Sequence, residues 1–190
     1  VFRGYVITGD GVATDPSKTE EINRWPVPRS TKDVRSFLGL CGYYRRFINQ
    51  YAEIAFPMTS LLKKGAKFRW SETCQEAFEK LKAALTSPPI LAMPRDEGTF
   101  FLDTDASDHS VGAVLSQMQD GQERVIAYAA KVLQPAQVKY CAYRRELLAT
   151  IIFDRHFRNH LLGHHWILLT YKAALSWLRK HRDPGGQNAR

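Results

Sequence analysis

The spacing of apolar residues changes partway along the chain, and this change most limits the folds open to it. Before residue 94, apolar side chains recur at intervals of three and four, as on helices buried along one face. After Gly98, short apolar or alternating runs separated by turn residues are typical of strands. The chain has 190 residues, enough for one large domain or two small ones. We therefore expect an α+β or α/β fold, with a helical segment followed by a domain built on a sheet.

Capping residues mark the starts of the predicted helices. Asp15 followed by Pro16 begins one helix, since Asp caps the free N–H groups and Pro loses nothing at the first position. A second helix begins at Ser30 or Thr31, and its apolar face is expected to continue to Ile48. Residues 52–62 are expected to form a short helix, and Ser71 begins a third clear one.

The second half predicts the order β-β-β-α-β-α. Strands are expected at 100–104, 111–117 and 125–130, with Asp120-Gly121 as a turn, then a helix at 143–160, a strand at 166–170 and a short helix at 173–179. The apolar residues expected to face inward from the long helix are Leu147, Leu148, Ile151, Ile152 and Phe157.

The chain is strongly basic, with a net charge of +8 and a pI near 9.5. Basic residues interleaved with aromatic ones favour nucleic acid as the partner, although a solvated helix face is the alternative. The candidate contacts with a phosphate backbone are Tyr43, Tyr44, Arg45, Arg46, Lys63, Lys64 and Lys67.

Cysteine usage and hydropathy indicate where such a chain works. Its three cysteines include no CxxC pair, which is typical of a reduced, intracellular protein, although the compartment stays open. No apolar run reaches 18 residues, so no membrane span is expected.

Two carboxylates stand where a metal site is expected. Asp105 follows the apolar strand that begins at Phe100, and Glu146 lies on the next long helix. Carboxylate oxygens at such positions suit a hard divalent cation, so Asp105 and Glu146 are the candidate catalytic and metal-binding residues. The later strand at 166–170 leads into Tyr171, where a third carboxylate would be expected. A neutral tyrosine hydroxyl does not replace a carboxylate near pH 7.

Several blocks of sequence carry a resemblance to a known family. They are Trp25–Pro28 (WPVP), Arg35–Leu40 (RSFLGL), Gly42–Ile48 (GYYRRFI), Pro57–Lys64 (PMTSLLKK), Phe78–Lys82 (FEKLK), Thr104–Ser107 (TDAS), Gly112–Gln117 (GAVLSQ) and Glu146–Ala149 (ELLA). Together they resemble the C-terminal part of the reverse transcriptase–RNase H polyprotein of gypsy-type LTR retrotransposons. By this resemblance, residues 1–12 are the end of the polymerase palm and residues 13–65 a helical thumb-like segment. Residues 66–98 are a connecting segment with a helix, and residues 99–190 a truncated RNase H-like domain.

The resemblance implies RNA-directed DNA polymerase and ribonuclease H activities for the parent polyprotein. The polymerase aspartates of that family precede this stretch of sequence, so the chain itself lacks the polymerase site. Tyr171 replaces a catalytic Asp of the family, and a last acidic ligand lies beyond Arg190. We therefore expect weak binding of Mg²⁺, or of Mn²⁺, and feeble or absent hydrolysis of RNA in RNA–DNA hybrids.

The resemblance also implies partners. These are an RNA–DNA hybrid or duplex nucleic acid, together with the fingers and palm of the parent polyprotein, and no membrane. The alternative function is a non-catalytic nucleic-acid-binding or protein-interaction module derived from a retroelement, and whether the chain is an enzyme stays open.

Overall fold

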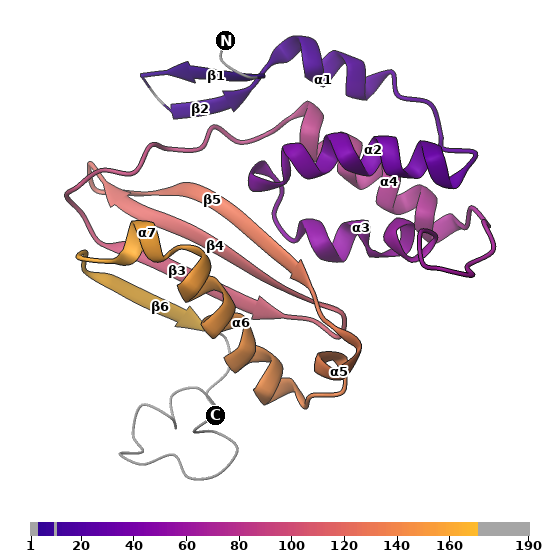
Figure 1. Cartoon of the computed structure of the whole chain (residues 1–190). Helices are drawn as coiled ribbons and strands as arrows, with labels where there is room; N and C mark the ends of the chain where they lie inside the picture. Colours follow the sequence, from indigo (N-terminus) through magenta and orange to yellow (C-terminus); the bar gives the residue numbers. More distant parts are fainter. Residues whose placement is uncertain (1–3, 10, 171–190) are drawn as a thin grey trace.

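The computed structural model describes residues 4–9 and 11–170. Its first half is a helical region, and its second half is a sheet with helices on one face (Figure 1). The elements of the helical region are α1 (Pro16–Asn23), α2 (Thr31–Tyr43), the 3₁₀ turn η1 (Arg45–Phe47), α3 (Tyr51–Ser60) and α4 (Glu72–Thr86).

The predicted helix caps are confirmed. The side chains of Asp15, Ser30 and Ser71 each accept a hydrogen bond from a backbone N–H in the first turn of α1, α2 and α4. The prediction for the end of α2 was wrong, because that helix stops at Tyr43. Ile48 lies beyond η1 and is still buried. The spacing of Ile48 from the preceding apolar residues therefore indicates that it belongs to the core, not that the helix continues. The chain has to turn there into α3, and Gln50 takes a left-handed conformation with φ 52°.

One apolar core holds the helical region together. Phe37 of α2 and Phe78 of α4 meet with ring centroids 4.6 Å apart, and Leu81 and Leu85 extend this contact along α4. A hairpin of β1 (Tyr5–Thr8) and β2 (Gly11–Thr14) packs at its edge and is tied by a backbone bridge from Val12 to Leu91. Helix α4 is therefore part of the apolar core of the helical region, although it follows α3 by a long loop in the sequence.

The second half contains a four-stranded sheet with the order β5-β4-β3-β6. Its strands are β3 (Phe100–Ala106), β4 (Ser110–Gln119), β5 (Gln122–Val132) and β6 (Trp166–Thr170). The first three form an antiparallel meander, and β6 returns parallel to β3 after α5 (Pro135–Val138), α6 (Ala142–His156) and α7 (Arg158–Leu161). The predicted turn at Asp120-Gly121 is confirmed, with φ 53° and 77°.

The long helix predicted at 143–160 is interrupted. Helix α6 ends at His156, and α7 begins after Phe157. Ile151 is 42% exposed, so its inward prediction was wrong. The fully buried residues of α6 are Glu146, Ala149 and Phe153, a narrow stripe three or four residues apart, because only one line of a helix touches a flat sheet.

The helical region packs against one face of the sheet, toward the edge strand β5. Helix α3 packs against β4 and β5, and η1 packs against β5, the edge strand nearest the helical region (Figure 1). Helix α6 covers the other face. The mixed α+β architecture expected from the sequence is confirmed. Within the described residues, no helix is long and apolar enough to cross a membrane.

Candidate carboxylate site and nucleic-acid interface

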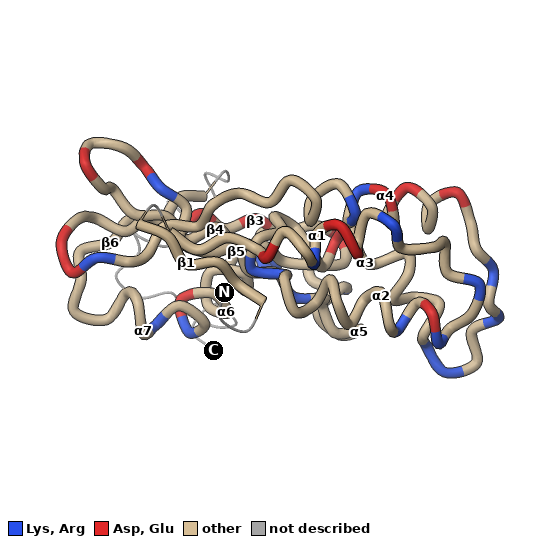
Figure 2. The backbone as a smooth tube through the Cα atoms, turned by 90° about the horizontal axis from the view of Figure 1, so that it is seen from above, with Lys and Arg blue, Asp and Glu red and all other residues tan. Residues whose placement is uncertain are grey.

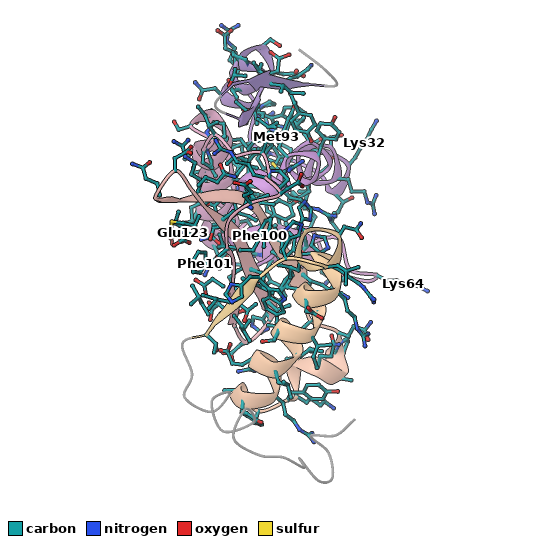
Figure 3. The ribbon with its side chains drawn as sticks, turned by 90° about the vertical axis from the view of Figure 1, so that its left-hand side faces the viewer. Lys32, Lys64, Met93, Phe100, Phe101 and Glu123 are labelled. Atoms are coloured by element: carbon teal, nitrogen blue, oxygen red, sulfur yellow. The ribbon has the colours of Figure 1, made fainter. Side chains whose placement is uncertain are left out.

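Strand β3 presents its residues alternately to two different neighbours. Phe100, Leu102 and Thr104 are buried on the α6 side, and Thr104 Oγ1 lies 3.4 Å from Thr150 Oγ1 of α6. In Figure 3, Phe100 and Phe101 lie on opposite sides of this strand, with Phe100 toward α6. Since neighbouring strand residues point to opposite faces, the exposed side chain of Asp105 points away from α6.

The two candidate metal ligands therefore belong to different faces. Glu146 is 2% exposed on the stripe of α6 that packs on the sheet. Asp105 lies on the far side and lines a cavity of about 110 Å³ with Gln50 and Glu53 of the helical region. The convergence of Asp105 and Glu146 on one ion stays a prediction from the sequence. Sequence spacing could not show which side of β3 carries Asp105, because a shift of one residue along a strand changes its face.

RNase H-like domains typically use Mg²⁺. A shared Mg²⁺ would need the carboxylate oxygens of Asp105 and Glu146 around one point, since a hard cation gathers its oxygen ligands closely. Among the residues that the structure describes, no group of three or more His, Cys, Asp or Glu side chains could hold a metal ion. Thr170 ends β6 beside Thr104, and Tyr171 lies outside the described residues.

The cavity beside Asp105 belongs to a closed contact between the two regions. The Ser107 and Ser110 hydroxyls donate hydrogen bonds of 2.6 and 2.7 Å to Glu53 Oε2. Beside them, the Phe56 ring stacks on His109 with centroids 4.4 Å apart and an interplanar angle of 1°. We call these five residues the acidic junction. Its partners satisfy one another, which is what a structural contact requires.

The aromatic and basic residues after α2 separate into two environments. Tyr43 is 49% exposed, and Arg45 and Arg46 are exposed on η1. Tyr44 is 2% exposed, and its hydroxyl donates to the Gly4 carbonyl oxygen. Tyr44 is therefore a core residue here, and its predicted contact with nucleic acid does not agree with its burial. The exposed ring of Tyr43 stacks on Tyr5, with centroids 5.4 Å apart.

Arg45 and Arg46 open into a groove along the edge strand β5. This cavity has a volume of about 860 Å³. Its charged and titratable Lys, Arg and His side chains, which we call the basic groove, are Arg45, Arg46, Lys131, Arg155, His156 and His160. None of the described residues that line it is Asp or Glu. Figure 2 shows a stretch of Lys and Arg positions between β5 and α3, where the sheet meets the helical region.

Two histidines of this groove have altered proton affinity. The pKa of His156 is lowered by its partial burial against the sheet, by the positive charge of Arg45 and by His160. The pKa of His160 is lowered by partial burial and by Arg46. His156 packs edge-on against Phe157, with ring centroids 4.7 Å apart. Both imidazoles therefore favour the neutral form while the groove holds no anion.

The remaining basic candidates lie elsewhere. Lys63, Lys64 and Lys67 follow α3 in the loop that leads to α4, and none of these three described residues lines the basic groove. Lys63 Nζ stands 5.3 Å from the centroid of the Phe56 ring, and Lys64 projects away from the body of the protein (Figure 3). Sequence reasoning missed Lys131, Arg155, His156 and His160, although the pair Arg155-His156 at the end of a helix was visible in the sequence.

Comparisons with known proteins agree with this architecture. A model of the RNase H-like domain found in reverse transcriptase matches residues 70–168. The chain belongs to this family. The match begins two residues before α4 and ends within β6, so it covers the whole meander and α6.

Curated relatives place this domain in larger proteins. The chain is 41% identical over 187 residues to the retrovirus-related Pol polyprotein from transposon 297 of Drosophila melanogaster, covering 98% of this chain and 17% of that protein. It is 35% identical over 161 residues to the transposon Tf2-3 polyprotein of Schizosaccharomyces pombe, covering 84% of this chain and 12% of that protein. The chain thus spans less than a fifth of these relatives and corresponds to the RNase H-like region of a retrotransposon Pol polyprotein.

Solved structures share the fold. A foamy viral protease-reverse transcriptase in complex with double-stranded DNA aligns with a TM-score of 0.79 and 22% identity, covering all of this chain and 40% of that one. The same enzyme in complex with an RNA/DNA hybrid aligns with a TM-score of 0.77 and 21% identity, covering 98% of this chain and 26% of that one. At this identity the likeness shows the arrangement of the helical region and the sheet.

Proposed function

We propose that this chain holds duplex nucleic acid within a Pol polyprotein and that its own hydrolysis of RNA in RNA–DNA hybrids is weak or absent. The observation that supports the proposal is that Asp105 lines a cavity with Gln50 and Glu53, whereas Glu146 is buried on the stripe of α6 that packs on the sheet. A two-metal cut needs carboxylates around a common pair of ions. The parent polyprotein would supply the polymerase fingers and palm.

Three further facts support the binding half of the proposal. The chain carries a net charge of +8. Arg45, Arg46 and the half-exposed Tyr43 lie on one surface, next to a groove lined by further basic residues. The foamy viral enzyme with the same fold is solved in complex with double-stranded DNA and with an RNA/DNA hybrid. Contacts of Lys and Arg with phosphates give affinity without sequence preference.

A second candidate function is magnesium-dependent hydrolysis, which the family match favours. Strand β6 lies parallel to β3, and Thr104 pairs with Thr170. For this function, Asp105 and Glu146 would have to reach one face together, with another group in the position of Tyr171.

One experiment separates the two candidates. A labelled RNA–DNA hybrid is incubated with the chain in Mg²⁺ and in Mn²⁺, and both binding and cleavage are followed, with Asp105→Asn and Glu146→Gln as matched variants. We expect binding that weakens by at least tenfold between about 50 and 200 mM salt, because several phosphates release counterions. We expect cleavage no faster than that of Glu146→Gln. Metal-dependent cleavage that both variants abolish would replace the binding proposal with the enzymatic one.

A further inference from the structure

The basic groove combines elements that lie far apart in the sequence. Arg45 and Arg46 come from η1, Lys131 from β5, Arg155 and His156 from α6, and His160 from α7. It therefore exists only where the helical region meets the sheet. Three arginines, one lysine and two histidines surround about 860 Å³, with no carboxylate among the described lining residues.

Such a concentration of positive charge is costly without a partner. Like charges around one cavity repel each other. The effect is visible at the two histidines, whose pKa values are lowered in part by Arg45 and Arg46. A bound anion offsets the repulsion among Arg45, Arg46, Lys131 and Arg155, and the two imidazoles can donate hydrogen bonds to it. His160 adds a buried Nδ1 that has no hydrogen-bond partner among the described residues.

We propose that the basic groove is a phosphodiester-binding site, in which Lys131, Arg155, His156 and His160 join Arg45 and Arg46 in holding the backbone of one strand of a nucleic-acid duplex. This inference rests on the proposed function and adds a site to it, formed by the sheet and by α6 and α7. The groove follows β5, so a polynucleotide lying along this strand passes from the helical region onto the RNase H-like domain (Figure 1).

Binding at this site takes up protons. A phosphate beside His156 and His160 favours their charged forms, so affinity rises as the pH falls through the range where the two rings titrate. The other charged or titratable groups that face them are Tyr43, Arg45, Arg46, Tyr128, Lys131 and Arg155. The arginines and the lysine of the groove set the basal affinity, and the histidines set its pH dependence.

The test changes two groove residues, Lys131 and Arg155, and leaves Arg45 and Arg46 in place. The dissociation constant of a labelled RNA–DNA hybrid, and of a DNA duplex of the same sequence, is measured by anisotropy for the unaltered chain and for Lys131→Gln/Arg155→Gln. The control is Lys32→Gln/Arg35→Gln, an equal loss of charge from exposed positions on α2, where Lys32 points away from the body of the protein (Figure 3). The fold of each variant is checked by its melting temperature.

We expect the groove variant to bind both duplexes about tenfold more weakly at 0.1 M salt. We also expect the slope of log affinity against log salt to fall by about two, since each lost phosphate contact removes roughly one unit. The control is expected to change affinity less than threefold. In a second arm, the gain in affinity between pH 8 and pH 6 is expected to shrink in His156→Gln/His160→Gln.

The outcomes separate the two proposals. Hybrid binding that survives unchanged in the groove variant overturns the groove site and leaves the proposed function standing. Failure of the unaltered chain to bind either duplex overturns both. Binding of a labelled acidic peptide is measured in the same way. If the groove variant keeps its hybrid affinity but loses affinity for this peptide, the β5 edge binds a polypeptide, which also overturns the groove site.

Discussion

The helical region and the sheet meet in two places that differ in chemistry. At the acidic junction, Glu53 accepts hydrogen bonds from Ser107 and Ser110 beside a cavity of about 110 Å³. At the basic groove, three arginines, a lysine and two histidines surround about 860 Å³. The junction satisfies its own polar groups, so it holds the two regions together. The groove does not neutralise its own charge, so it is suited to a partner that brings the opposite charge.

The largest expected effect tests whether the acidic junction couples the two regions. Replacing Phe37 with alanine leaves a cavity in the helical core and is expected to lower the free energy of unfolding by about 3–5 kcal/mol. If the junction couples the regions, amides of α2 and of β4 become exposed to hydrogen exchange together. The matched variant Phe101→Ala, at a half-exposed ring in β3, is expected to cost about 1 kcal/mol. Separate unfolding of the helical region would show that the junction does not join them.

A middle-sized effect distinguishes the junction from the groove. Glu53→Ala removes the acceptor of two hydroxyl groups and is expected to cost about 1 kcal/mol, or roughly 2–4 °C in melting temperature. Glu53→Gln, which keeps one acceptor oxygen, is expected to lose less. Neither variant should change hybrid affinity by more than about twofold. If a Glu53 variant lost as much hybrid affinity as Lys131→Gln/Arg155→Gln, the acidic junction would also contribute to binding, and the proposed difference between the junction and the groove would be wrong.

The smallest expected effect concerns pH. Because the folded-state pKa values of His156 and His160 are lowered, the unfolded chain binds more protons between those values and about 6.5. The free energy of unfolding is therefore expected to fall as the pH drops through that window. Urea unfolding at several pH values should show this decline, and it should be smaller in His156→Gln/His160→Gln. An identical decline in both proteins would show that His156 and His160 do not cause the pH dependence of the free energy of unfolding.

Asp33 and Asp120 affect stability in a different pH range. Their pKa values are lowered by hydrogen bonds, so their contribution to the free energy of unfolding is lost only in more acidic solution.

Local signals in the sequence determined much of the fold. Asp15, Ser30 and Ser71 begin helices because a short polar side chain satisfies free N–H groups nearby. Asp120-Gly121 makes a turn because both residues tolerate positive φ, and the strand at 166–170 follows from its run of apolar residues. The sequence blocks between Trp25 and Ala149 together were sufficient to place the chain in its family.

Tertiary structure decided which of these residues share a site. Whether Asp105 and Glu146 face each other depends on the face of β3 that α6 covers, which the spacing of residues along the chain does not fix. Tyr44 looked like a surface aromatic beside two arginines, yet it fills the core because the chain turns after α2. The basic groove draws on residues from 45 to 160, so it appears only when the helical region packs against β5. The sequence by itself determined the elements and the family, because those depend on neighbouring residues; the sites required the packing of distant segments.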